Sequence, residues 1–124
     1  MNFDFSDDEQ QLREAVLRWV ERGYTFERRR AIEKSGGFSP EVWGEIAELG
    51  LLGLGTSEDD GGMAMGPVAA MLALEALGRG LVLEPVAAVA LGAASVIARS
   101  PAQARADWAP RIASGEARVV LAYQ

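Results

Sequence analysis

The chain has 124 residues, of which 49% are hydrophobic, and its formal net charge at pH 7 is −6. This length fits one domain with a modest core, and the apolar content is too high for a disordered chain. The negative charge argues against a nucleic-acid-binding surface, which needs a basic stripe. The chain has no cysteine and no histidine, so disulfides, thiol catalysis and Ser-His-Asp catalysis are excluded and we expect no metal site.

The first expected helix starts behind Ser6. Ser6 and Glu9 form a capping box, in which the serine caps the helix and the glutamate bonds back. The helical pattern continues, with a disturbance at Gly23, to about Lys34, where Ser35-Gly36-Gly37 breaks it. One face of this helix carries an apolar stripe, which consists of Leu12, Ala15, Val16, Trp19 and Val20.

A second helix is expected from Ser39-Pro40, a cap followed by a proline at the first helical position. Its apolar face carries Trp43, which we expect in the core. The helix ends at Gly50, where a residue that tolerates positive φ is favoured. The connector Leu51–Gly55 alternates leucine with glycine, as in a buried segment close to other backbone, and Glu58–Gly62 is expected to be a solvated turn.

Two further segments, Pro67–Arg79 and Pro85–Arg99, are apolar on nearly all sides, so we expect them to be the most buried helices. Two stretches that overlap these segments, Gly61–Leu74 and Pro85–Ala98, are almost free of charged residues, and each is about 14 residues long. A membrane span needs about 20 residues, so we expect no membrane insertion. Residues 1–20 are charged throughout, so we also expect no signal peptide and a cytoplasmic location.

The C-terminal part carries a repeated capping signal and a change of pattern. Ser100-Pro101-Ala102-Gln103 starts a last helix to about Ser114, which Gly115 ends. Arg118–Tyr123 is rich in β-branched and aromatic residues, which predicts a β-strand. A single strand cannot satisfy its own backbone groups, so another chain or a continuation of this one must pair with it.

Three features have both a functional and a structural interpretation. Glu75 lies on an otherwise apolar helix, which suits a catalytic carboxylate, but we favour a pair with Arg79 or with a neighbouring helix because buried carboxylates are usually paired. Arg28-Arg29-Arg30 is interpreted as a solvated helix face rather than a grip for a CoA phosphate. The pairs Gly36-Gly37 and Gly61-Gly62 match no phosphate-binding motif, so we interpret both as turns.

The segment Val42–Gly62, VWGEIAELGLLGLGTSEDDGG, resembles part of the N-terminal helical domain of the acyl-CoA dehydrogenases. In that family an apolar LGLLGL connector follows the second helix and leads to a PEEYGG-like turn. The resemblance extends from Phe5 to the C-terminus. Two positions depart from the family pattern, because Ser57 stands where the family usually has proline and Asp60 where it usually has an aromatic residue.

The resemblance implies an all-α, antiparallel helical bundle over residues 1–116. Residues 117–124 would then start a middle β-domain, because the segment from Ala113 to Gln124 resembles the family's transition into that domain. The resemblance therefore implies that this chain is an N-terminal piece of a longer protein. The family's catalytic base is a glutamate from the C-terminal helical domain or a nearby helix. Nothing in this chain matches that site, so Glu75 does not inherit the role and we expect no catalytic residue here.

The resemblance also implies two sets of contact residues. Residues 87–95 resemble the helix that lines the family's acyl pocket, and ordinary close helix packing is an equally weighted alternative for any one of them. Residues 121–124 correspond to a strand that contacts the flavin, often with a threonine where Gln124 stands. The expected substrate-binding residues are Ala87, Ala88, Leu91, Ala94 and Ser95, and the expected FAD-binding residues are Leu121, Tyr123 and Gln124.

The function that the resemblance implies is that of a flavin-dependent acyl-CoA dehydrogenase. Such an enzyme removes the α-proton of an acyl-CoA thioester and transfers a hydride from the β-carbon to FAD. The expected partners are the acyl-CoA substrate and an electron-transfer partner, within a homo- or hetero-oligomer, and we expect this chain alone to be inactive. The alternatives are a non-catalytic subunit of a heteromeric dehydrogenase, which the AYQ ending resembles, and a stand-alone helical interaction module.

Overall fold

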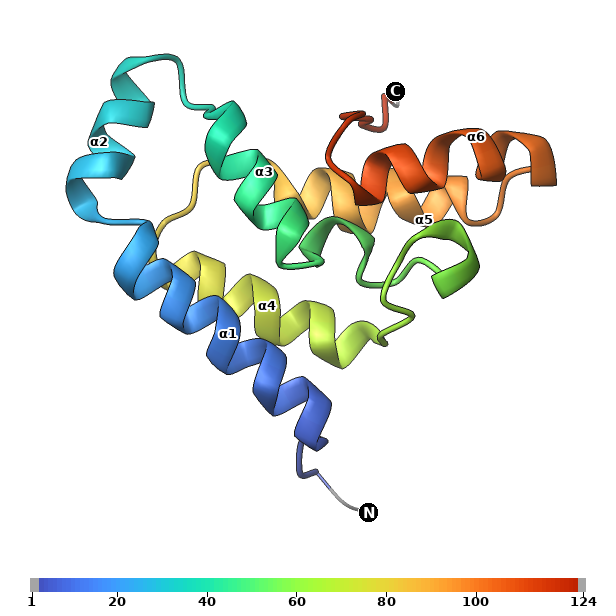
Figure 1. Cartoon of the computed structure of the whole chain (residues 1–124), viewed down its shortest axis with the longest axis horizontal. Helices are drawn as coiled ribbons and strands as arrows, with labels where there is room; N and C mark the ends of the chain where they lie inside the picture. The colour runs from blue at the N-terminus through green and yellow to red at the C-terminus, as the bar shows by residue number, and fades with distance from the viewer. Residues whose placement is uncertain (1–2, 123–124) are drawn as a thin grey trace.

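A computed structural model of the chain describes residues 3–122, and every regular element in that range is helical (Figure 1). The all-α class predicted from the sequence is therefore confirmed. In chain order the elements are α1 (Asp7–Gly23), α2 (Phe26–Lys34), α3 (Pro40–Glu48), the 3-10 turns η1 (Leu51–Gly53) and η2 (Glu58–Asp60), α4 (Pro67–Arg79), the π-helical η3 (Ala87–Ala93), α5 (Ala94–Ile97) and α6 (Ala102–Ala113).

The N-terminal capping box forms as predicted, but the long helix behind it is two helices. Ser6 Oγ accepts from the Glu9 amide at 3.2 Å, and the Glu9 carboxylate accepts from the Ser6 amide at 2.9 Å. The chain breaks at Tyr24, whose side chain turns into the core, and Thr25 then caps α2 by accepting from the Arg28 amide at 3.2 Å. The prediction of one helix to Lys34 was wrong because a buried aromatic residue and a second cap outweigh helical propensity there.

Helices α1 and α4 form the most extensive helix pair, and they run in the same direction (Figure 1). Arg13 Nη2 lies 3.5 Å from Glu75 Oε1, and further along both helices Val20 lies against Gly80. The prediction of an antiparallel bundle is therefore wrong for this pair. The apolar stripe determines which face of a helix is buried, but the connections between helices determine its direction.

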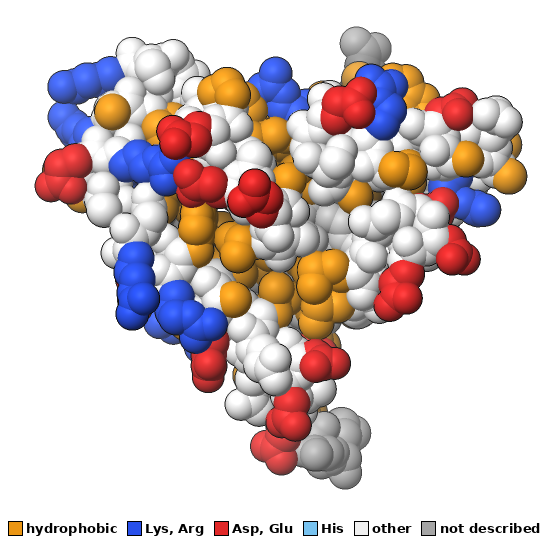
Figure 2. All heavy atoms as spheres, in the orientation of Figure 1, with side chains coloured by type: hydrophobic (Ala, Val, Ile, Leu, Met, Phe, Trp, Pro, Cys, Tyr) orange, Lys and Arg blue, Asp and Glu red, His pale blue; other side chains and the backbone are white. Residues whose placement is uncertain are grey.

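Helix α3 and the connector behind it build the centre of the core. Ser39 caps α3, and Gly50 has φ 78°, the left-handed conformation predicted at this helix end. Gly53 is buried so closely that a Cβ there would lie 2.9 Å from the Ala113 Cβ, which confirms the predicted close approach. Trp43 is 3% exposed, which confirms its predicted core position. On the face shown in Figure 2, hydrophobic side chains gather between α1 and α3, with charged side chains around them.

Helix α4 is buried along much of its length, as predicted, but the segment from Pro85 to Arg99 is not. η3 buries Val89, Ala90 and Ala93, whereas α5 buries no residue. The prediction that this segment is among the most buried was wrong because small apolar residues also occur on helix faces that another element of the same chain does not cover. Within the described residues, no helix is both long and apolar enough to cross a membrane.

The last helix forms as predicted, although its expected cap does not. Ser100 Oγ donates to the Val96 carbonyl at 2.9 Å, and Pro101 stands at the N-cap without a side-chain hydrogen bond. Beyond Gly115, residues 118–122 form no strand, so the predicted strand at Arg118–Tyr123 is wrong for the described residues. Between residues 3 and 122 no neighbouring strand is present to pair with them, and β-branched residues alone do not hold a ladder. Tyr123 lies outside the described residues.

Candidate functional site

A cavity of about 580 Å³, here named the α4–α5 cavity, lies where the start of α4 faces η3 and α5. Three of the expected substrate-binding residues, Leu91, Ala94 and Ser95, line it. Ala87 and Ala88 are exposed on η3 and line neither this cavity nor the second one described below. The remaining lining residues are Gly55, Met65, Gly66, Pro67, Ala70, Ala90, Ala98 and Arg99.

The walls of the α4–α5 cavity are mostly small and apolar. Alanine, glycine and proline leave the space that larger side chains would fill, and Met65 and Leu91 supply flexible apolar surface. The cation of the cavity is Arg99, whose Nη1 donates to the Ser95 carbonyl at 2.8 Å. A hydrocarbon group with a polar end fits such a site, because apolar walls with a few placed polar groups are typical of small-molecule pockets.

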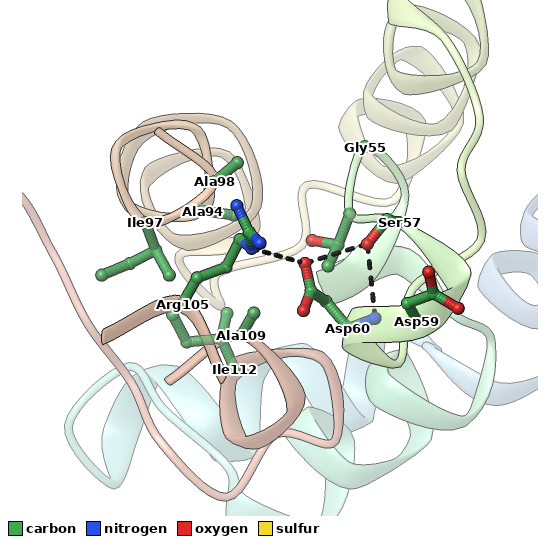
Figure 3. A pocket seen from close by; sticks show the side chains of 11 residues that line it. Gly55, Ser57, Asp59, Asp60, Ala94, Ile97, Ala98, Arg105, Ala109 and Ile112 are labelled. Atoms are coloured by element: carbon green, nitrogen blue, oxygen red, sulfur yellow. Dashed lines mark hydrogen bonds and ion pairs between the residues drawn. The ribbon is translucent and has the colours of Figure 1, made fainter. Parts of the chain in front are cut away.

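A second cavity of about 380 Å³, here named the α6 cavity, lies between α6, α5 and the acidic turn around η2 (Figure 3). Its polar residues are connected. Arg105 Nε on α6 lies 3.3 Å from Asp60 Oδ2, and Ser57 Oγ donates to the same oxygen at 2.9 Å. Ala94, Ile97 and Ile112 contribute apolar wall.

Sequence reasoning missed the α6 cavity. The sequence predicts a solvated turn at Glu58–Gly62 and gives no sign of a role for Arg105. The turn itself forms, with Ser57 capping η2 by accepting from the Asp60 amide at 3.3 Å. The available signal was Asp60, an acidic residue where the resembled family usually has an aromatic one. Its partner lies on α6, far along the chain, so spacing alone could not reveal the pair.

Of the expected FAD-binding residues, only Leu121 belongs to the described part of the chain. Its side chain is exposed and lies near Gly92 of η3. The amides of residues 118–122 donate no hydrogen bond within residues 3–122, so these donors are free there. Such donors suit the carbonyl oxygens of a flavin ring, so these residues fit the expected group. Tyr123 and Gln124 lie outside the described residues.

Glu75 has the structural role that was favoured. Its Oε1 lies 3.1 Å from Arg79 Nη2 and 3.5 Å from Arg13 Nη2, and its side chain is about half exposed. Arg28 does not lie on the solvated helix face that was predicted for it. The two terminal nitrogens of its guanidinium reach Glu45 oxygens at 2.6 and 3.0 Å, so Arg28 connects α2 to α3 and is not part of a solvated face.

The Arg28–Glu45 pair is also hydrogen-bonded to α1. Trp19 Nε1 donates to Glu45 Oε2 at 2.7 Å. Hydrogen bonding from the Arg28 guanidinium lowers the pKa of the Glu45 carboxyl from its ordinary value, although partial burial opposes the shift. The charged form of Glu45 is therefore the form that the fold stabilises.

A buried carboxylate, Glu84, lies in the connection between α4 and η3 and is hydrogen-bonded to residues at the end of α1 and the start of α3. It is 4% exposed and accepts from the Tyr24 hydroxyl and from the Ser39 amide, both at 3.1 Å. The Tyr24 oxygen in turn accepts from the Leu83 amide at 3.1 Å. Burial raises the pKa of the Tyr24 phenol, and the charge of Glu84 adds to the shift. All three groups hold the chain in position and none of them lines either cavity.

Comparison with known proteins gives a family match and several matches to solved structures, including the two that follow. The family profile described as "Acyl-CoA dehydrogenase, N-terminal domain" matches residues 6–116. A solved structure of the Tcur3481-Tcur3483 steroid ACAD, in a variant form, matches with a TM-score of 0.83 and 29% identity, covering 92% of this chain and 32% of that chain. No curated protein matches.

The second structural match is the electron transferring flavoprotein of Acidaminococcus fermentans, studied for flavin-based electron bifurcation. Its TM-score is 0.75 at 20% identity, and the match covers 93% of this chain and 31% of that chain. At this identity the likeness shows the fold alone. The chain thus spans about a third of the length of both solved structures.

Proposed function

The chain belongs to the acyl-CoA dehydrogenase N-terminal domain family, and on that premise we propose that it is the N-terminal domain of a flavin-dependent acyl-CoA dehydrogenase. The observation that carries the proposal is the family match, which includes all six α-helices of the described residues. The α4–α5 cavity supports it, because Leu91, Ala94 and Ser95 meet there on a mostly apolar wall. The reaction is the α,β-desaturation of an acyl-CoA thioester.

In this proposal the described residues bind and shield the acyl group. Small side chains around Ala94 give an acyl chain room, and Leu91 covers it from water. Contacts with the pocket walls would orient the thioester, and excluding water would strengthen the polar contacts around it. FAD, when bound, supplies the acceptor for the hydride that leaves the β-carbon. Leu121, Tyr123 and Gln124 would hold the flavin, with the free amides of residues 118–122 as donors.

The remaining two thirds of the enzyme would supply the rest of the site. We propose that residues 117–124 lead into a β-domain, that the catalytic base comes from outside this chain, and that the enzyme is an oligomer that passes electrons to a partner protein. The α-helical domain of residues 1–116 would act as one wall of the acyl pocket. Alone it would be inactive, since it has neither the base nor most of the flavin contacts.

A second candidate is a non-catalytic subunit of a heteromeric dehydrogenase. The observation that favours it is Gln124, which stands where the resembled family often has a flavin-contacting threonine. The 29% identical steroid ACAD has a paired name, Tcur3481-Tcur3483, and supports the same alternative. In such an enzyme the chain would complete a pocket whose flavin another subunit holds.

The test uses the complete protein that carries these residues. After purification, absorbance near the flavin bands measures the bound cofactor, and addition of acyl-CoA thioesters without oxygen should bleach those bands. Linear and steroid-bearing thioesters are both tried. Flavin binding without bleaching by any thioester would contradict the dehydrogenase. A protein that holds no flavin by itself, and whose mixture with a flavin-holding second subunit is bleached by a thioester, would support the heteromeric alternative.

A further inference from the structure

The α4–α5 cavity and the α6 cavity adjoin each other. Both are lined by Gly55, Ala94 and Ala98, and none of these residues has a side chain larger than a methyl group. Figure 3 shows Ala94 and Ala98 on the helix side of the α6 cavity and Gly55 on the loop side. At about 580 and 380 Å³, each cavity lies within the size range of small-molecule sites. The boundary between them is thin.

We propose that the two cavities form one acyl channel, and that its end at Arg105 binds an uncharged oxygen substituent, a hydroxyl or a carbonyl, at the end of the acyl group remote from the thioester. This proposal rests on the proposed function. It assigns as substrates acyl groups that carry a remote hydroxyl or carbonyl, which a purely apolar pocket would not select.

Arg105 supplies the hydrogen-bond donors. Its Nε faces Asp60 at 3.3 Å, and Ser57 holds the Asp60 carboxylate through its hydroxyl at 2.9 Å. The two terminal nitrogens of the guanidinium donate no hydrogen bond within residues 3–122. In Figure 3 the guanidinium lies between Asp60 and the helix that carries Ala94 and Ala98. Asp60 therefore positions the arginine and leaves donors for a ligand oxygen.

The charges of the α6 cavity favour an uncharged oxygen over a carboxylate. Its polar lining holds one cation, Arg105, and two carboxylates, Asp59 and Asp60. A ligand carboxylate would meet a net negative site, whereas a hydroxyl or carbonyl oxygen accepts from Arg105 without that repulsion. Ile97, Ala109 and Ile112 supply the apolar surface that a hydrocarbon group needs.

The test compares three thioesters of equal length with the complete protein. Their acyl groups end in a methyl, a hydroxyl or a carboxyl group. We expect the hydroxyl-ended thioester to have a kcat/KM about tenfold or more above the methyl-ended one, because a hydrogen bond to a charged group typically gives about a tenfold to hundredfold preference. The carboxyl-ended thioester should fall below the hydroxyl-ended one.

Arg105→Met removes the donors and keeps an apolar stem of similar length. It should bring the hydroxyl-to-methyl ratio of kcat/KM close to one, and Arg105→Lys should restore part of the ratio. Arg79→Met is the matched control, because Arg79 pairs with Glu75 on α4 and lines neither cavity. The ratio should not change in that variant. Melting temperatures show which variants fold.

Ala94→Leu tests the channel without touching the polar end. It should lower kcat/KM for all three long thioesters by a larger factor than for a four-carbon thioester, since only long groups reach the boundary between the cavities. Calorimetric binding of the same thioesters needs no turnover, so it separates the two proposals. Failure of every thioester to react would contradict the dehydrogenase, while tighter binding of the hydroxyl-ended thioester that Arg105→Met abolishes would still support the channel.

Equal kcat/KM and equal binding for the hydroxyl-ended and methyl-ended thioesters would overturn the channel proposal. A ratio that survives in Arg105→Met, or a preference for the carboxyl-ended thioester, would overturn it as well. If Arg105→Met does not fold, Arg105→Lys and Ala94→Leu still decide, because an unchanged substrate profile in both variants would contradict the assignment.

Discussion

The corner where α1, α2 and α3 meet and the opposite end formed by η3, α5 and α6 are built in different ways. In the corner, long polar side chains pair in fixed geometry, as in Arg28 with Glu45 and Tyr24 with Glu84. At the other end, alanine and glycine leave cavities of about 580 and 380 Å³. Directional pairs fix positions, whereas short apolar side chains leave space. Stability is therefore expected to depend on the corner, and ligand selection on the η3–α6 end.

Trp43→Ala tests the corner with the largest expected effect. The side chain is 3% exposed and lies on Phe38 with ring centroids 5.8 Å apart, so its removal leaves a cavity. We expect a loss of about 3–5 kcal/mol in the free energy of unfolding, measured by denaturant titration. Trp43 Nε1 is buried without a hydrogen-bond partner in the described residues, so the loss is one of packing. Trp108→Ala on α6 is the control, because Trp108 is 40% exposed, and a similar loss there would contradict the comparison.

Arg28→Met should destabilise the protein by roughly 1.5–3 kcal/mol at pH 7, since it removes charged hydrogen bonds from a partly buried carboxylate. The exposed Arg30, 3.9 Å from Glu33, is the matched control, and Arg30→Met should change stability by at most about 0.5 kcal/mol. Denaturant titration measures both variants.

The stability that the Arg28–Glu45 pair contributes should depend on pH. The folded pKa of Glu45 is depressed, so the stabilisation by its pair is fully present above the unfolded pKa of about 4.3 and is lost as the pH falls through the lower folded pKa. The difference between the unmodified protein and Arg28→Met should therefore shrink below pH 4. A difference that stays constant down to pH 2 would show that the pair contributes no charge-dependent stability.

Tyr24→Phe should cost about 1–2 kcal/mol, because it leaves buried Glu84 with the Ser39 amide as its remaining donor and removes the acceptor of the Leu83 amide. Ser100→Ala removes a hydroxyl at the η3–α6 end, where its acceptor is an exposed backbone carbonyl. We expect a change below about 0.5 kcal/mol there. Thermal unfolding measures both variants, and an equal loss of stability in the two would contradict the proposed difference between the regions.

Ala88→Leu has the smallest expected effect on stability, below about 0.5 kcal/mol, because Ala88 is exposed on η3. In the complete protein it tests the expected acyl pocket. If residues 87–95 line that pocket, the larger side chain should reduce kcat/KM for the longest accepted acyl-CoA more than for short ones, with normal flavin content. An equal reduction at all chain lengths would contradict a pocket role for Ala88.

Signals confined to a few residues predicted the structure best. The Ser6 and Ser39 caps, the turn at Gly50 and the buried Trp43 all follow from neighbours within one or two helical turns. The break at Tyr24 depends on Glu84, which is 60 residues away along the chain. Local patterns carry no information on such partners, so the sequence indicated helices and faces but not helix directions.

In the candidate site, too, some residues could be predicted from the sequence and others could not. The resemblance pointed to Leu91, Ala94 and Ser95, which the structure brings together at one cavity, and to Ala87 and Ala88, which it places elsewhere on η3. The Arg105–Asp60 pair was missed because an arginine on a polar helix face is indistinguishable in sequence from a solvated one.

The parallel packing of α1 on α4 has a consequence for how the chain acquires its fold. Arg13 and Glu75 meet only after the segments that form α2, α3 and the connector have closed into a long loop. Such distant contacts slow folding relative to a bundle of sequential hairpins, because the chain loses the entropy of the closed loop before the stabilising contacts form. During synthesis, α1 leaves the ribosome well before its partner. Until α4 follows, the apolar stripe of Leu12, Val16 and Val20 is exposed, and such surface makes an incomplete chain prone to aggregation.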